Sequence, residues 1–123
     1  MKRIWTILLF ASMVLAVHAQ KLISYIKDDG AWYQVYDVQG KKIATISKQT
    51  VGAIVGWSTD FFVSHDGSWY KIYDASGRLL KTISKSTVGK VVAVSGNTFT
   101  CNDGHWIKIY DRTGKLLSTR SAQ

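Results

Sequence analysis

The chain has 123 residues, with 16 Lys and Arg against 8 acidic residues, one cysteine and no proline. This length suits a single domain, and one cysteine excludes an intramolecular disulfide framework, so packing must stabilise the fold. The excess of positive charge allows anionic glycans, lipopolysaccharide or nucleic acid as partners, and it is equally compatible with a role in solubility alone.

Residues 1–19 have the features of a secretory signal peptide. Two basic residues open the segment, an apolar run follows, and Val17 and Ala19 are small residues spaced for signal peptidase. The apolar run is shorter than the about 20 residues that a membrane-spanning helix needs. We therefore expect an exported protein, periplasmic or extracellular, whose mature chain of residues 20–123 forms one domain without a membrane span. Without Lys2 and Arg3, 14 basic residues stand against 8 acidic ones, a net charge of about +6.

The rest of the chain is an internal repeat of 37 residues without gaps, most regular from Trp69 to Ser84. Five residue types recur in register: Trp32, Trp69 and Trp106; Tyr36, Tyr73 and Tyr110; Asp37, Asp74 and Asp111; Gly40, Gly77 and Gly114; Thr45, Thr82 and Thr119. No segment from Lys21 onward has helical periodicity. Short alternating runs rich in Val, Ile, Thr, Tyr and Trp are separated by glycines, a pattern typical of strands.

One complete repeat divides into four predicted strands, at residues 61–65, 69–74, 78–83 and 88–94. The first connection is Asp-Gly, at 29–30, 66–67 and 103–104, which predicts a type I′ turn with φ > 0 at both central residues. The second is Asp-x-x-Gly, at 37–40, 74–77 and 111–114, which predicts a type I turn followed by a left-handed glycine. The third, at 47–50 and 84–87, is predicted to be a polar loop.

The chain enters at the first strand of one repeat, residues 24–27, and leaves at the third strand of another, residues 115–120. We therefore predict an all-β meander of about 11 short antiparallel strands. Three short sheets are the natural grouping, either blade-like or prism-like, since three units are fewer than the four blades of the smallest usual β-propeller.

The run of residues 62–78 resembles one subdomain of the bulb-type mannose-binding lectins, which build a three-sided β-prism from three such units. Those lectins bind mannose through Gln, Asp, Asn, Val and Tyr at alternate positions. The matching positions here are His65, Gly67, Trp69, Lys71 and Tyr73. Only the tyrosine agrees, so the resemblance implies no mannose pocket.

The Trp-Tyr-x-x-Tyr-Asp-x-x-Gly-Lys repeats as a whole resemble those of small, uncharacterised exported proteins of Bacteroidetes. This resemblance covers the mature chain from end to end and includes a signal segment that ends in Ala-Gln. It implies export and a repeat architecture, and it implies no activity.

The sequence offers little for catalysis or metal binding. There is no Glu, six of the eight Asp have turn roles, and Asp28 and Asp60 have no repeat partner that would form an acid/base pair. His65 and His105 occupy unrelated turn positions, where we expect them to be solvated, and one Cys with scattered His gives no metal-ligand spacing. We predict a non-enzymatic protein without a cofactor. Cys101 is expected to be a free thiol, partly exposed because it aligns with the polar Ser64 and Lys27.

Alternation along the second strand of each repeat predicts two faces. One face carries Tyr33 and Val35, Tyr70 and Ile72, and Ile107 and Ile109, and is the predicted core. The other carries Trp32, Gln34 and Tyr36, Trp69, Lys71 and Tyr73, and Trp106, Lys108 and Tyr110. This second set could be an aromatic platform for sugar rings or nucleic-acid bases with a cation alongside. The alternative is that these Trp residues pack between sheets while the Lys ammonium groups extend to solvent.

The candidate ligand-binding residues are therefore Trp32, Tyr36, Trp69, Lys71, Tyr73, Trp106, Lys108 and Tyr110. Together these patterns favour an exported binding or interaction module, with anionic glycans as the candidate ligands. The alternative function is a structural cell-envelope protein that self-associates and has no small ligand. Nucleic acid is not expected as a partner, because the basic residues are spread over strands and loops.

Overall fold

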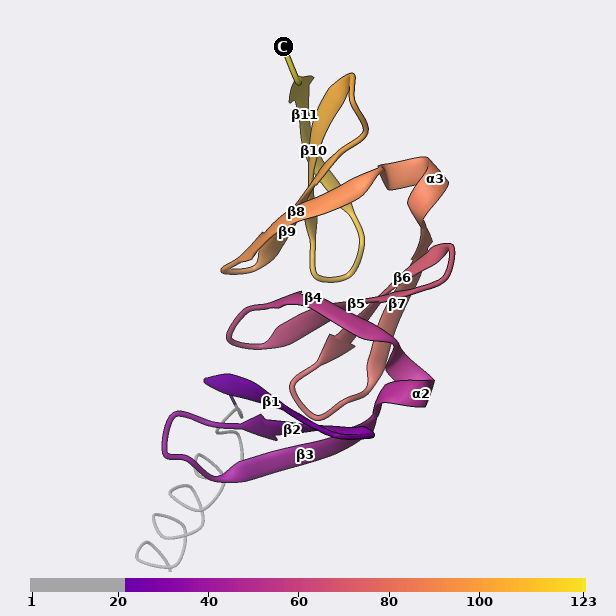
Figure 1. Cartoon of the computed structure of the whole chain (residues 1–123). Helices are drawn as coiled ribbons and strands as arrows, with labels where there is room; N and C mark the ends of the chain where they lie inside the picture. Colours follow the sequence, from indigo (N-terminus) through magenta and orange to yellow (C-terminus); the bar gives the residue numbers. More distant parts are fainter. Residues whose placement is uncertain (1–21) are drawn as a thin grey trace, which may run out of the picture.

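The computed structural model describes residues 22–123, so the predicted signal peptide and its cleavage site lie outside the described residues. These residues form eleven strands in three antiparallel sheets, which lie one above another in Figure 1. The all-β prediction is confirmed. Sheet 1 contains β1 (Tyr25–Asp29), β2 (Trp32–Tyr36) and β3 (Lys42–Ser47). Sheet 2 contains β4 (Ala53–Trp57), β5 (Phe61–Asp66), β6 (Trp69–Asp74) and β7 (Leu79–Ser84). Sheet 3 contains β8 (Lys90–Ser95), β9 (Thr98–Asn102), β10 (Trp106–Asp111) and β11 (Leu116–Ser121).

The third connection of each repeat is a single helical turn, not the polar loop that we expected. These turns are α2 (Lys48–Val51) and α3 (Lys85–Val88). Each ends at a glycine with positive φ, Gly52 at 83° and Gly89 at 87°. The turn carries the chain off the edge of one sheet and into the next layer, as the connection through α3 shows in Figure 1. The fourth predicted strand therefore pairs with the following repeat, β4 with β5 and β8 with β9.

The first hairpin turn differs from its prediction, and the second agrees with it. Asp66 pairs directly with Trp69, so the two central residues are Gly67 and Ser68, and only Gly67 has positive φ, at 63°. This is the pattern of a type II′ turn, so the type I′ prediction is wrong. In the second hairpin, the Gly77 amide donates to the Asp74 carbonyl at 3.0 Å and Gly77 has a φ of 90°, as predicted.

Two hydrophobic clusters hold the sheets together, one at each interface between neighbouring sheets. Tyr33 and Val35 of sheet 1 pack with Phe62 and Tyr73 of sheet 2. The opposite face of sheet 2 packs against sheet 3 through a cluster composed of Phe61, Val63, Tyr70, Ile72, Val88, Phe99, Cys101 and Tyr110. Sheet 2 is thus covered on both faces. Because β6 has buried residues on both faces, Tyr70 and Ile72 on one and Tyr73 on the other, alternation on this strand does not separate core from surface.

Cys101 is fully buried in the cluster between sheets 2 and 3, so the expectation of partial exposure is wrong. Burial raises the pKa of its thiol to about 12. Ser64, whose alignment suggested a surface position, is itself fully buried. A polar residue at this register therefore does not indicate exposure, because sheet stacking covers the position regardless of its chemistry.

No helix in residues 22–123 is both long enough and apolar enough to cross a membrane.

The first prediction concerns the close approach at Gly89. A Cβ there would lie 2.6 Å from Asp103 Cα and 2.7 Å from the Asn102 carbonyl oxygen, whereas a Cβ at Gly104 would meet nothing within 4 Å. Both glycines have positive φ, 87° and 97°. We expect Gly104→Ala to lower the free energy of unfolding by the ~1–3 kcal/mol of backbone strain alone, and Gly89→Ala to lower it further because backbone must move. Urea denaturation of both variants measures their free energies of unfolding. An equal decrease in the two variants would contradict a steric role for Gly89.

Candidate functional site

The three repeated Trp residues occupy the same position in successive sheets. Trp32, Trp69 and Trp106 begin β2, β6 and β10 respectively. Their exposed fractions are 49%, 48% and 48%. Facing sheets pack about 10 Å apart, so equivalent positions recur at regular intervals along the stack. The structure therefore presents three half-exposed indole rings at equivalent positions of its three sheets.

The Lys residues of the predicted platform form ion pairs and hydrogen bonds within the fold. Lys71 Nζ lies 2.8 Å from an Asp66 carboxylate oxygen, and Lys108 Nζ lies 3.4 Å from Asp103. The hydrogen bond from Lys71 to Asp66 raises the pKa of the lysine. Each ammonium also reaches a carbonyl of the preceding helical turn, Thr50 in α2 and Thr87 in α3, at 3.4 Å. These two Lys residues fasten α2 and α3, and their charge is balanced by aspartate.

The Tyr residues of the predicted platform lie deeper. Tyr73 and Tyr110 are buried, while Tyr36 of sheet 1 is half-buried. The Tyr73 ring stacks on Phe62 at 5.1 Å between centroids, and Tyr110 stacks on Phe99 at 5.3 Å. Burial raises the pKa of both buried phenols. Within the predicted platform, the Trp side chains are thus half-exposed, the Lys side chains form ion pairs with Asp, and two of the three Tyr side chains are buried.

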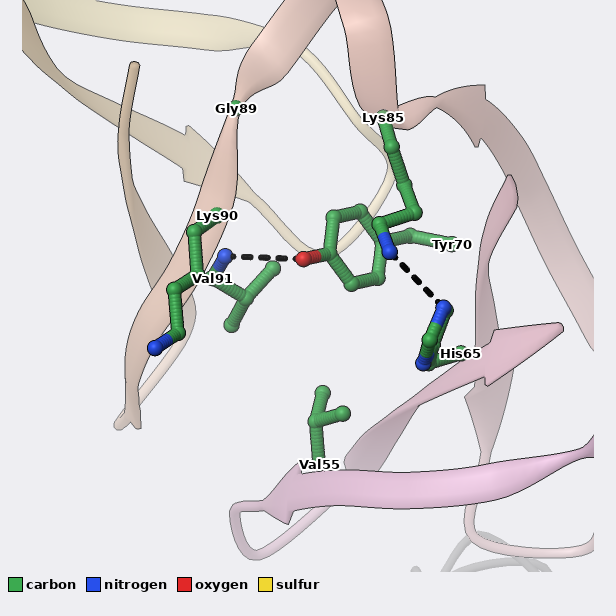
Figure 2. A pocket seen from close by; sticks show the side chains of 7 residues that line it. All are labelled: Val55, His65, Tyr70, Lys85, Gly89, Lys90 and Val91. Carbon is green, nitrogen blue, oxygen red and sulfur yellow. Dashed lines mark hydrogen bonds between the residues drawn. The ribbon is translucent and has the colours of Figure 1, made fainter. Parts of the chain in front are cut away.

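A second candidate site, which sequence reasoning missed, is a cleft between sheets 2 and 3 (Figure 2). It has a volume of about 390 Å³ and is lined by Val55, His65, Tyr70, Lys85, Gly89, Lys90 and Val91. The Lys85 ammonium lies 2.8 Å from His65 Nε2 and 5.6 Å from the centre of the Tyr70 ring. His65 is half-buried and bonded, not the solvated turn residue that we expected, whereas His105 is exposed. Comparison of the repeats position by position could have revealed the site, since His65 replaces Asp28.

The two carboxylates without a predicted turn role, Asp28 and Asp60, do not pair with each other. Asp28 pairs with Lys48, and Asp60 lies 3.7 Å from Arg112. Within residues 22–123, no group of three or more His, Cys, Asp or Glu side chains is placed to hold a metal ion.

Comparison with known proteins yields no relative. No protein-family model matches the chain, and neither a curated protein nor a solved structure matches it. The geometry of the chain itself is therefore the basis for a functional proposal.

The second prediction concerns the turn carboxylates, one of which positions Trp106. Asp103 accepts hydrogen bonds from the His105 and Trp106 amides, and Asp111 accepts from the Thr113 hydroxyl and the Lys115 amide. These bonds lower the pKa of both carboxyls. A lowered folded-state pKa contributes stability above the unfolded pKa of about 3.9, and this stability is lost as pH falls through the folded value.

We therefore expect the urea midpoint to fall as pH is lowered below about 4. Asp111→Asn should have a lower midpoint at neutral pH and a shallower acid dependence, because the neutral amide cannot titrate. An unchanged acid slope in this variant would contradict the role of Asp111.

Proposed function

We propose that the chain is an exported, non-enzymatic β-repeat module, periplasmic or extracellular, that binds anionic glycans. The observation that carries the proposal is the threefold recurrence of a half-exposed Trp at the start of β2, β6 and β10. An aromatic ring with one free face can stack on the apolar face of a sugar while its indole N–H finds a polar partner. An exposed Trp needs an explanation more than a scattered exposed Leu does, and three at equivalent positions favour a shared ligand.

Repetition makes weak stacking useful. Three equivalent rings on one body can contact three units of the same polymer, so binding of the second and third units is intramolecular and gains effective concentration. The predicted net charge of the mature chain, about +6, favours an acidic polymer over a neutral one. Since Lys71 and Lys108 are paired with aspartate, this preference comes from the other Lys and Arg residues.

A second candidate function, a structural envelope protein that self-associates, is favoured by the outer face of sheet 3. Tyr70 and Ile72 of sheet 2 are buried by sheet 3, whereas their repeat equivalents, Ile107 and Ile109, are only half-buried. Leu117 in β11 is exposed as well. A stack that ends in an apolar sheet face can add a further copy, as repeat proteins do when their terminal unit lacks a polar cap.

The third prediction tests the Trp platform with polyanionic and neutral polysaccharides, polygalacturonate and dextran. Trp69→Ala should weaken polygalacturonate binding at least several-fold in affinity electrophoresis, because a nucleic-acid base stacked on one aromatic ring contributes about 1–3 kcal/mol and we expect a stacked sugar to reach the lower part of this range. The matched control is Leu79→Ala, since Leu79 lies in the same sheet and is 49% exposed, as Trp69 is 48% exposed. This control should bind as the parent does.

Folding should survive the Trp69 change, because half of the ring is already in solvent. If Trp69→Ala instead costs the ~3–5 kcal/mol of a core aromatic, the ring is a packing element and the platform is refuted. Unchanged polygalacturonate binding in a folded variant would also refute it.

The fourth prediction tests self-association. If the second candidate function is correct, the chain should elute in size-exclusion chromatography with a mass that rises with concentration. Ile109→Lys should return it to the monomer, because a charge on the outer face of sheet 3 would remain unpaired in an interface. A constant monomer mass over the accessible concentrations would exclude this candidate.

A further inference from the structure

The two interfaces between sheets place a Lys over a Tyr ring at equivalent positions, but only the first Lys has a carboxylate partner. At the first, Lys48 lies over the Tyr33 ring, 5.2 Å from its centre, and forms an ion pair with Asp28. At the second, Lys85 lies over the Tyr70 ring in the same way. His65 stands where Asp28 stood, so the salt bridge at this position is lost. Among the described residues, Lys85 has no carboxylate partner within salt-bridge distance.

His65 has two possible hydrogen-bond partners, so it does not depend on Lys85. His65 Nε2 lies 2.8 Å from Lys85 Nζ and also 2.9 Å from the Gly67 carbonyl oxygen. A charged ammonium only donates, so Nε2 must be unprotonated to accept from it, whereas Nε2 must carry a proton to donate to Gly67. One nitrogen can serve one of these partners at a time. If Lys85 turns toward a ligand, His65 keeps a hydrogen bond by donating to Gly67.

Tyr70, which pairs with His65 across sheet 2, supplies a second donor, because its hydroxyl reaches across to β8. The Val91 amide donates to Tyr70 Oη at 3.1 Å, as Figure 2 shows, so this oxygen already accepts a bond. Its own hydroxyl proton has no acceptor among the side-chain hydrogen bonds of residues 22–123 and can be donated to a ligand. Val55 and Val91 add apolar surface from β4 and β8.

A further cation lies at the rim of the cleft. Lys90 is exposed and replaces Ala53 of the previous repeat. In Figure 2 its side chain points away from His65 and Lys85, and rotation of its flexible stem would bring the ammonium toward the opening. No Asp lines the cleft, so its titratable lining is cationic or neutral.

We propose that this cleft binds a small organic oxyanion, a carboxylate, sulfate or phosphate attached to a body of about the size of one sugar ring. Lys85 supplies the charge, Tyr70 Oη donates a hydrogen bond, and Lys90 approaches from the rim. A volume of about 390 Å³ exceeds what a bare ion fills and falls in the range of small-molecule sites. The site is separate from the Trp platform and does not depend on the proposed function.

The test is a titration of the ¹⁵N-labelled chain with sodium glucuronate, sodium sulfate and glucose, followed by the amide signals of Gly89 and Val91. Glucuronate should cause saturable shifts, sulfate weaker ones, and glucose none. Lys85→Met removes a charged donor while keeping the stem, so glucuronate affinity should fall about tenfold to a hundredfold, the equivalent of one charge-assisted hydrogen bond.

His65→Asp is the more specific variant, because it reproduces the Asp28–Lys48 pair of the first interface. The new carboxylate should form an ion pair with Lys85 without unfolding the chain. It should abolish the glucuronate shifts. The matched control is Asp28→Asn, which changes the equivalent position of the first repeat and should leave the shifts at Gly89 and Val91 intact.

Three outcomes would overturn the proposal: no saturable shift with glucuronate, undiminished affinity in folded His65→Asp, or an equal loss in Asp28→Asn. The last would show that the loss does not depend on the pair of His65 and Lys85, because Asp28→Asn raises the net charge and lies at the other interface. Trp69→Ala should leave glucuronate binding unchanged, so failure of the platform and failure of this site give different results.

Discussion

The structure depends on the close contact between the end of each helical turn and the backbone of the next sheet. Gly89 passes so near Asn102 and Asp103 that a side chain there would collide with main-chain atoms, and Gly52 makes the same approach to His65. The Gly89 amide bonds to the Lys85 carbonyl at 2.8 Å, and the Lys85 amide bonds to the Ser68 carbonyl at 2.9 Å. These contacts set the direction in which the chain leaves one sheet, and hence how the next sheet is placed on it.

This constraint explains the role of the Lys residues beside the repeated Trp. Lys71 and Lys108 each join an aspartate of a hairpin to a carbonyl of the preceding helical turn. The repeat conserves this connection between its own copies because every interface between sheets needs it. In the sequence, the position of Lys71 and Lys108 near the repeated Trp suggested cations that bind a ligand. In the structure, their contacts connect neighbouring layers.

Stacking also explains why the two ends of the molecule differ from its middle. Each sheet contacts only its neighbours, so sheet 2 has two packed faces and the outer face of sheet 3 has no sheet beyond it among the described residues. Thr98 and Thr100 take the places of the buried Phe61 and Val63 on that outer face, which makes it less apolar than an internal face. The remaining Ile107 and Ile109 keep part of the apolar character on which the self-association candidate rests.

The sequence by itself determined the strands, their number and their turns at Asp74 and Gly77, because these depend on local alternation and on the backbone freedom of glycine. It also identified the recurring Trp residues. Only the tertiary structure decided that β4 joins β5, that Tyr73 and Cys101 are buried, and that His65 meets Lys85. Each of these depends on how one sheet lies on the next, and a pattern of period two cannot tell a face covered by a neighbouring sheet from a face exposed to water.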